Sequence, residues 1–211
     1  MSRKIFIDAG ANDGSSVELF RKAFKDHDEY DIYSFEPNLE FENKLKEKDI
    51  HYSMSAVWIF DGEVEFYVDS NRRMLGSTLI KEKTTGALDR GNPSVVKCID
   101  FDQWIRYTFK KTDYIIVKLD IEGAEWKVLD KMIEGGSIEY IDELYGEWHV
   151  GKVGKSINDL NQMKNNLKEY GLKMLNWCAE SSEIGDVNIR DWNSHHRFGY
   201  RKKIIKNEGE K

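Results

Sequence analysis

The sequence contains very few cysteines and prolines and no long apolar run, and each shortage excludes a class of protein. Cys98 and Cys178 are its only cysteines, and two thiols so far apart make neither a disulfide framework nor a zinc site. Such thiols fit a reducing compartment. No stretch of about 18 apolar residues occurs, so we expect no transmembrane helix. A strand-like run already begins at Lys4, which leaves no room for a signal peptide, so we expect a cytoplasmic protein.

The chain also lacks an excess of positive charge. Its 211 residues include 32 lysines and arginines against 38 acidic residues, a net charge of −6. Non-specific binding to nucleic acid or to an anionic membrane requires a basic surface, so we expect neither partner. Aromatic residues make up 12% of the chain, which favours a folded protein over a disordered one. No repeat or Pro/Gly/Ser-rich linker occurs, so we expect a single domain over residues 1–211, which a longer polypeptide could also contain.

Short apolar runs alternate along the chain with segments whose apolar residues recur at helical spacing. This alternation predicts an α/β fold with a mostly parallel sheet and helices on both faces. A capping-box pattern occurs at Ser15 with Glu18, Ser156 and Asp159 are expected to cap a later helix, and a hairpin is predicted at residues 61–62. The predicted strands cover residues 5–7, 30–35, 52–60, 64–68, 95–99, 114–117, 141–148, 172–178 and 198–205.

Ligands bind open parallel sheets beyond the carboxyl ends of the strands, so the residues that follow each strand form the candidate site. After the first strand, Asp8 leads into a turn with Gly10 and Gly14, where glycine lets the backbone approach a ligand closely. A dinucleotide fingerprint would require glycine in place of Asn12 and Ser15. A carboxylate at Asp8 would repel a pyrophosphate and attract an ammonium or sulfonium centre. A turn that only connects strand and helix is the alternative.

Acidic residues and a histidine follow the next strands. Glu36, about 20 positions past the glycine turn, is placed to accept both ribose hydroxyls of a nucleoside, with a solvated glutamate as the alternative. Asp120 and Glu122 follow the most apolar strand, where helix capping would also explain them. Oxygen donors at Asp120 and Glu147 could hold a hard divalent cation such as Mg²⁺. His149 is a natural proton acceptor, although a lone histidine is more often structural.

One long irregular segment, residues 70–93, is rich in glycine, asparagine, arginine and threonine. In a compact domain such a loop is usually a lid or a binding loop. We expect this segment to cover the substrate that accepts the transferred group at the strand ends, with Arg72, Arg73, Ser77 and Thr78. An insertion that makes no contacts is the alternative.

Four stretches of the chain together resemble the FkbM family of class I S-adenosylmethionine (AdoMet) methyltransferases. They read FIDAGANDG at residues 6–14, FEPN at 35–38, SAV at 55–57 and VKLDIEGAE at 117–125, and the similarity spans about residues 4–200. The resemblance implies a Rossmann-like sheet of seven strands with an antiparallel final strand. It also implies AdoMet-dependent methylation of hydroxyl groups, on sugars or on polyketide-type natural products.

The resemblance also assigns parts of AdoMet to the strand ends. Glu36 would bind the ribose, Asn38 would border the adenine, and Asp120 would lie near the sulfonium. Asp120 and Glu147 match the metal position of related sugar methyltransferases and would hold Mg²⁺ or Mn²⁺, although His149 replaces a carboxylate of that site. The implied cofactor-binding residues are Asp8, Gly10, Ala11, Asn12, Asp13, Gly14, Ser16, Glu36, Asn38, Ser55, Ala56 and Asp120.

Four side chains at the strand ends have predicted catalytic roles. Methyl transfer from a sulfonium is an in-line displacement, so the enzyme must chiefly align donor and acceptor. Glu122 or His149 would take the proton of a sugar or glycan hydroxyl, while Asp120 and Glu147 hold the metal against it. The alternatives are a methyltransferase of a non-sugar natural product, an inactive AdoMet-binding module, and a nucleotide-dependent oxidoreductase or epimerase, which the missing glycines disfavour.

Overall fold

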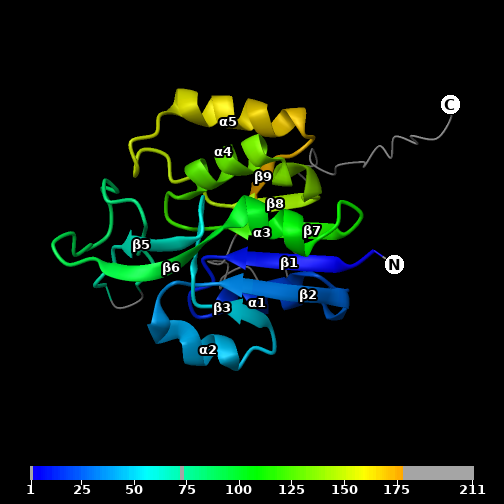
Figure 1. Cartoon of the computed structure of the whole chain (residues 1–211), viewed down its shortest axis with the longest axis horizontal. Helices are drawn as coiled ribbons and strands as arrows, with labels where there is room; N and C mark the ends of the chain where they lie inside the picture. Colours follow the sequence, from blue (N-terminus) through cyan, green and yellow to red (C-terminus); the bar gives the residue numbers. More distant parts are fainter. Residues whose placement is uncertain (1, 72–73, 178–211) are drawn as a thin grey trace.

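A six-stranded sheet forms the centre of the molecule (Figure 1). The computed structural model of the chain describes residues 2–71 and 74–177. The six strands are β1 (Lys4–Ala9), β2 (Tyr30–Phe35), β3 (His51–Ser53), β7 (Tyr114–Leu119), β8 (Glu143–Gly146) and β9 (Met174–Asn176). Their order is β3-β2-β1-β7-β8-β9 and every pairing is parallel, so the carboxyl ends of all six meet at one edge.

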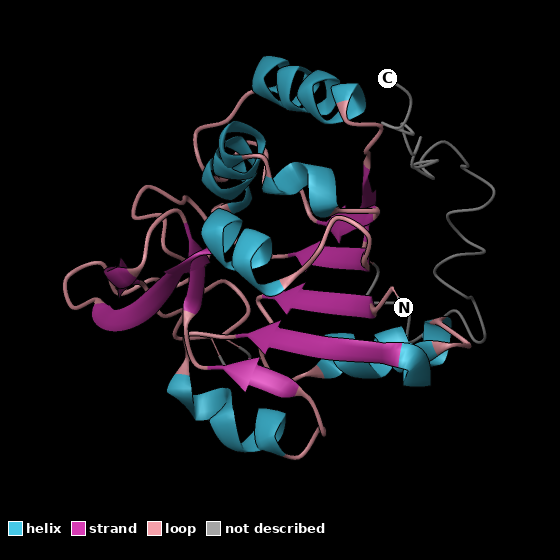
Figure 2. Ribbon diagram, turned by 45° about the vertical axis from the view of Figure 1, so that its right-hand side comes forward, coloured by secondary structure: helices cyan, strands magenta, loops and turns pink. Residues whose placement is uncertain are grey.

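Helices cover both faces of this sheet (Figure 2), because its central strands are apolar on both sides. The helices are α1 (Ser15–Ala23), α2 (Glu42–Lys46), α3 (Phe101–Thr108), α4 (Glu125–Gly135) and α5 (Ile157–Glu169), with short 3₁₀ turns η1 (His27–Glu29), η2 (Leu39–Phe41) and η3 (Ser137–Tyr140). On one face, Ile7 and Val117 belong to a core with α3, α4 and α5. On the other face, Phe6 and Ile116 pack with α1. The α/β architecture predicted from the sequence is confirmed.

A second, smaller sheet has the order β4-β6-β5, from β4 (Ala56–Trp58), β5 (Gly62–Phe66) and β6 (Ser94–Asp100). The single strand predicted over residues 52–60 is wrong, because β3 belongs to the large sheet and β4 to the small one. The hairpin predicted at residues 61–62 is also wrong. The strand β6 lies between β4 and β5 and pairs with both, parallel to β4 and antiparallel to β5. An Asp-Gly turn shows where the chain reverses but not which strand becomes the partner.

The two predicted helix caps have different outcomes. Ser156 and Asp159 cap α5 as predicted, and they do so as a complete capping box. The box predicted at Ser15 and Glu18 is wrong, because Gly14, with a φ of 80°, precedes α1 without a side-chain cap. The Glu18 carboxylate forms an ion pair with a lysine instead.

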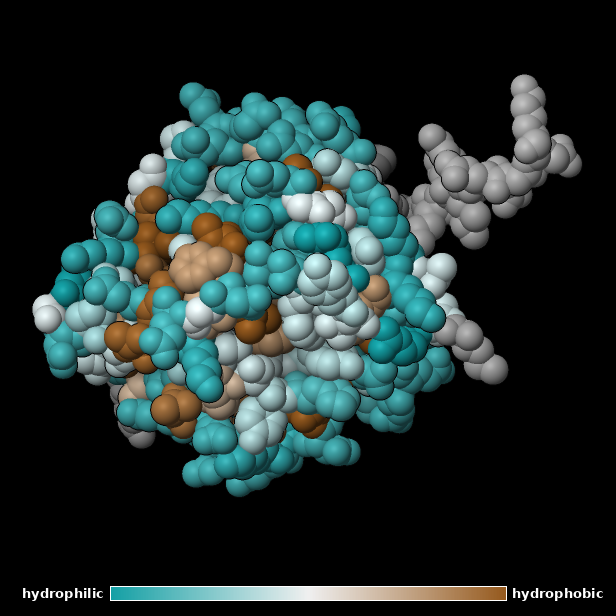
Figure 3. All heavy atoms as spheres, in the orientation of Figure 1, coloured by the Kyte–Doolittle hydropathy of each residue, from teal (hydrophilic) through white to brown (hydrophobic). Residues whose placement is uncertain are grey.

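The seventh, antiparallel strand is not confirmed, since its predicted residues 198–205 lie outside the described residues, as does Cys178. Cys98 is a buried free thiol. Within residues 2–71 and 74–177, no helix has the length and apolar character needed to cross a bilayer. Figure 3 shows a mainly hydrophilic face with scattered apolar patches. Exposed apolar side chains include Phe60 and Val95, which belong to the region of the small sheet.

Candidate active site

The turn after β1 is held against the ends of two neighbouring strands. The amides of Gly10 and Ala11 both donate hydrogen bonds to the carbonyl of Phe35, each at 3.0 Å. Gly10 has a φ of 80°, and a Cβ at this position would lie 1.9 Å from the carbonyl oxygen of Asp120. Only glycine permits so close an approach of two backbones. The turn therefore brings the ends of β1, β2 and β7 together.

Glu36 follows β2 and lies against this turn. Its side chain is buried; its Oε2 accepts a hydrogen bond from the amide of Asn12 and its Oε1 one from the amide of Asn38, each at 2.8 Å. Burial raises the pKa of Glu36 to about 7, although the two amides oppose the shift. Each carboxylate oxygen has more than one lone pair, so Glu36 can accept further hydrogen bonds.

A buried ion pair adjoins the glycine turn. Asp8 and Lys118 are neighbours in the register of β1 and β7, and Nζ of Lys118 lies 3.0 Å from Oδ1 of Asp8. The same Nζ donates a hydrogen bond to the carbonyl of Gly10 at 2.8 Å. Burial raises the pKa of Asp8, and the ammonium of Lys118 opposes that shift. The Asp8 carboxylate is thus paired with the lysine that holds the turn.

His149 is completely buried between two carboxylates. Its Nε2 lies 3.3 Å from Oε2 of Glu122, and its Nδ1 lies 3.1 Å from Oε1 of Glu125. Burial alone would lower the pKa of His149, but the two carboxylates raise it to about 10. The imidazole is therefore protonated at neutral pH and takes up no further proton. This geometry favours Glu122 over His149 as the proton acceptor.

Glu122 lies in a strained turn between β7 and α4. Its φ of 54° is in the left-handed region, which residues with a side chain seldom adopt. Glu125 holds this turn, since its two carboxylate oxygens accept hydrogen bonds from the amides of Ile121 and Gly123, each at 2.8 Å. Gly123 has a φ of 105°, and a Cβ there would lie 2.3 Å from Cγ1 of Val153. Neither carboxylate caps α4, whose N-cap residue Ala124 has no side-chain cap. Glu125 instead holds the turn, and the Glu122 side chain makes other contacts.

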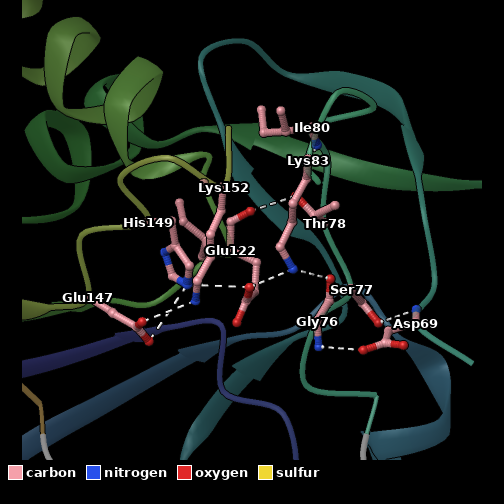
Figure 4. A network of polar contacts seen from close by, with 12 residues as sticks. Asp69, Gly76, Ser77, Thr78, Ile80, Lys83, Glu122, Glu147, His149 and Lys152 are labelled. Atoms are coloured by element: carbon pink, nitrogen blue, oxygen red, sulfur yellow. Dashed lines mark hydrogen bonds and ion pairs between the residues drawn. The ribbon is translucent and has the colours of Figure 1, made fainter. Parts of the chain in front are cut away.

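The 67–93 segment, which joins β5 to β6, contacts this turn (Figure 4). Nζ of Lys83 lies 2.7 Å from Oε2 of Glu122, and the hydroxyl of Thr78 donates to the carbonyl of Glu122 at 2.8 Å. Burial would raise the pKa of Glu122, but His149 and Lys83 hold it below its usual value. The contacts with the sheet edge exclude an insertion without contacts, and coverage of the acceptor stays a prediction. Arg72–Arg73 lie outside the described residues.

A family model described as the methyltransferase FkbM domain matches residues 8–174. The chain belongs to the FkbM methyltransferase family. The resemblance predicted from the four motifs is thereby confirmed. The matched residues of this FkbM methyltransferase run from β1 to the start of β9 and include the carboxyl ends of β1, β2, β3, β7 and β8. No curated protein and no solved structure gives a significant match.

The predicted cofactor residues of this FkbM methyltransferase gather at the ends of β1, β2, β3 and β7. Hydrogen bonds join the glycine turn, Glu36 and Asn38, and the Asn38 side chain also donates to the sulfur of Met74 at 3.3 Å. The hydroxyl of Ser55 lies 2.9 Å from that of a serine in β3. Asp13 is peripheral, with 42% of its side chain exposed. Their roles in binding stay predictions. The buried members of the set are Asp8, Ala11, Ser16, Glu36, Asn38, Ser55 and Ala56.

The metal predicted at Asp120 and Glu147 also stays a prediction. Among the described residues, Asp120, Glu122 and His149 can place one donor atom each within 4.8 Å of one another. Glu147 lies 3.3 Å from Nζ of Lys152 and 3.7 Å from Nε2 of His149. Positively charged side chains of the protein therefore already contact these donors: His149 and Lys152 contact Glu147, and Lys83 contacts Glu122. While these side chains are in place, the residues fit a divalent ion poorly.

Two lysines of the site were not predicted from the sequence. Lys118 carries a usable signal, because a charged residue inside an apolar strand requires a buried partner, and the register of the parallel sheet provides Asp8. Lys83 carries no such signal. It belongs to an irregular segment whose path no periodicity predicts.

Proposed function

We propose that this methyltransferase transfers the methyl group of AdoMet to a hydroxyl group of a sugar or glycan. The buried carboxylate of Glu36 is the observation that carries the proposal. It follows β2, two main-chain amides orient it, and it retains lone pairs for the two hydroxyls of a ribose. The adjacent strand β1 ends in the glycine turn, so a nucleoside held by Glu36 would lie along that turn.

The residues at this edge fit AdoMet better than a dinucleotide. Dinucleotide sites place a pyrophosphate on a glycine-rich turn at a helix N-terminus. Here Asn12 and Ser15 occupy two of the required glycine positions, and the carboxylate of Asp120 next to the turn would repel phosphate groups. AdoMet is a nucleoside without phosphate, and when bound it supplies a methyl group activated on a positively charged sulfur.

Glu122 is the group that takes the acceptor's proton in this proposal. Its carboxylate is ionised, because His149 and Lys83 lower its pKa. Both cations contact Oε2, whereas Oε1 has no partner among the described residues. A sugar hydroxyl is a weak nucleophile until its proton is removed. A carboxylate suffices as base because the hydroxyl becomes strongly acidic as its oxygen bonds to carbon, and Oε1 can accept the proton at that stage.

The polar character of the edge supports a hydroxyl-rich acceptor. Asp120, Glu122 and Glu147 offer carboxylate oxygens, and Lys152 offers N–H donors, within one region of the structure. Such mixed donors and acceptors suit the ring of a sugar. A hydroxylated natural product that is not a sugar is the alternative acceptor, and a module that binds AdoMet without turnover is the alternative function.

Equilibrium binding of AdoMet, S-adenosylhomocysteine and NAD⁺ to the purified protein tests the donor. We expect AdoMet to bind and NAD⁺ not to bind. At about pH 8, Glu36→Ala should weaken AdoMet binding about tenfold or more, because hydrogen bonds to a charged group are lost. Glu40→Ala, at an exposed glutamate of the following turn η2, is the matched control and should bind AdoMet normally. Preferential binding of NAD⁺ would overturn the proposal.

Incubation with deuterated-methyl AdoMet and a panel of glycans and hydroxylated small molecules identifies the acceptor. We expect mass spectrometry to find a trideuteromethyl group on a sugar hydroxyl. Label on a non-sugar compound alone would establish the alternative acceptor. Tight AdoMet binding without label on any compound would favour the module without turnover.

A further inference from the structure

Lys83 is buried although it belongs to an irregular segment. Its side chain is 1% exposed, and its Nζ contacts Oε2 of Glu122 at 2.7 Å and the carbonyl of Gly76 at 2.6 Å (Figure 4). Burying an ammonium group costs free energy even when it is paired, and an apolar side chain would avoid that cost. The contact between Lys83 and Glu122 therefore calls for a functional explanation.

The segment that carries Lys83 is itself held by hydrogen bonds. The buried carboxylate of Asp69 accepts hydrogen bonds from the amides of Asn71, Gly76 and Ala87. A Cβ at Gly76 would lie 2.5 Å from Oδ2 of Asp69, so the segment closes tightly around this carboxylate. Lys83 thus extends from a fixed frame toward the sheet edge.

The same segment holds both the main chain and the side chain of Glu122. The hydroxyl of Thr78 binds its carbonyl, and Lys83 binds its Oε2. The left-handed conformation of Glu122 is strained and persists only where surrounding contacts enforce it. His149 contacts the same Oε2 at 3.3 Å. Two cations share Oε2, and Oε1 has no hydrogen-bond or ion-pair partner within the described part of the chain.

We infer that Lys83 is a positioning residue for methyl transfer, which holds Oε2 of Glu122 and thereby reserves Oε1 for the acceptor's proton. The inference rests on the proposed function. In that reaction the proton passes from the acceptor hydroxyl to Oε1 as the acceptor oxygen bonds to the methyl carbon. The electrons of the broken carbon–sulfur bond stay on sulfur, and Lys83 forms and breaks no covalent bond. The 67–93 segment therefore completes the catalytic centre.

A double-mutant cycle between Lys83 and Glu122 tests this role. Lys83→Met removes the charge and should lower kcat by up to about 10²-fold, with KM for AdoMet unchanged. Glu122→Gln removes the base and should lower kcat by about 10²- to 10⁴-fold. The double variant should be no slower than Glu122→Gln alone, because Lys83 then has no carboxylate left to position. Lys81→Met, at an exposed lysine of the same segment, is the matched control and should keep the wild-type rate.

Two kinetic results would overturn the inference. In the first, the double variant loses the product of the two single losses, which means that Lys83 acts independently of Glu122. In the second, Lys83→Met keeps the wild-type kcat.

Hydrogen exchange tests the same contact without an acceptor. We expect Lys83→Met to speed amide exchange at residues 74–90 and 121–125 relative to the wild type and to Lys81→Met, while residues 10–14 stay protected. Unchanged exchange at 121–125 would show that Lys83 does not hold Glu122, and the inference would be wrong. A wild-type protein that neither binds AdoMet nor methylates any hydroxyl is a separate result, which overturns the proposed function instead.

Discussion

Gly10 is the residue at which the backbones of the site approach each other most closely. Gly10→Ala would place a Cβ 1.9 Å from the carbonyl oxygen of Asp120 and would also strain a φ of 80°. Gly151→Ala is the matched control, because its φ is 77° but no atom lies within 4 Å of the added Cβ. It should cost only backbone strain, roughly 1–2 kcal/mol. Urea denaturation should show a clearly larger loss in free energy of unfolding for Gly10→Ala, and equal losses would contradict the close approach.

The buried imidazole of His149 gives stability a pH dependence of definite sign. Its pKa rises from an ordinary 6.5 to about 10 on folding, so the folded chain binds one more proton between these values. Its stabilising contribution is complete below pH 6.5 and is lost as the pH rises through about 10. The difference in free energy of unfolding between wild type and His149→Gln should therefore shrink from about pH 6 to pH 10. Urea denaturation across this range measures it, and a difference that grows with pH would contradict the assigned ion pairs.

Sequence patterns predicted where the carboxylates of the site lie, but not which cations accompany them. Glu36 and Glu122 follow apolar strands, so their place at the edge of a parallel sheet follows from the strand pattern. Their ionisation depends on neighbours that only the fold brings near. Lys83 comes from an irregular segment, and the two nitrogens of His149 contact one carboxylate from the turn before α4 and one from the first residue of α4. The shift of His149 toward the protonated form could therefore not be predicted from the sequence.

At the scale of elements, two helix starts with similar sequence patterns differ in structure. Ser156→Ala removes the hydroxyl of a complete capping box and should destabilise the protein by about 1 kcal/mol. Ser15→Ala removes a hydroxyl that caps nothing at α1 and should leave stability nearly unchanged. Thermal denaturation of the two variants side by side measures the difference. A larger effect at Ser15 would contradict the assigned caps.

The positions of most strands could be predicted from apolar runs, whereas the partners of some could not. A bend at residues 54–55 separates β3 from β4 and sends them into different sheets. The strand β6 pairs with both β4 and β5, although the whole 67–93 segment separates it from them in the chain. Turn residues indicate only that the chain reverses locally. They cannot identify a pairing strand such as β6, which lies further along the sequence.

At the scale of the whole molecule, the charges at the sheet edge predict catalysis without a metal ion. Lys83, His149 and Lys152 contact the acidic groups that a divalent ion would otherwise neutralise. Treatment with a chelator should therefore leave the rate of methyl transfer unchanged, and added Mg²⁺ or Mn²⁺ should not raise it. A loss of rate that these ions restore would instead establish the metal predicted at Asp120 and Glu147.

The antiparallel pairing of β5 with β6 sets Phe66 opposite Ser94, so the two ends of the 67–93 segment stand side by side on the small sheet. The entropy cost of closing such an excursion grows only slowly with its length. A stretch of different length or composition could therefore be grafted between these two residues while every strand keeps its register, provided that it retains counterparts of Thr78 and Lys83 at Glu122. Exchange of the remainder of this stretch is the simplest way to vary this part of the site on an unchanged sheet.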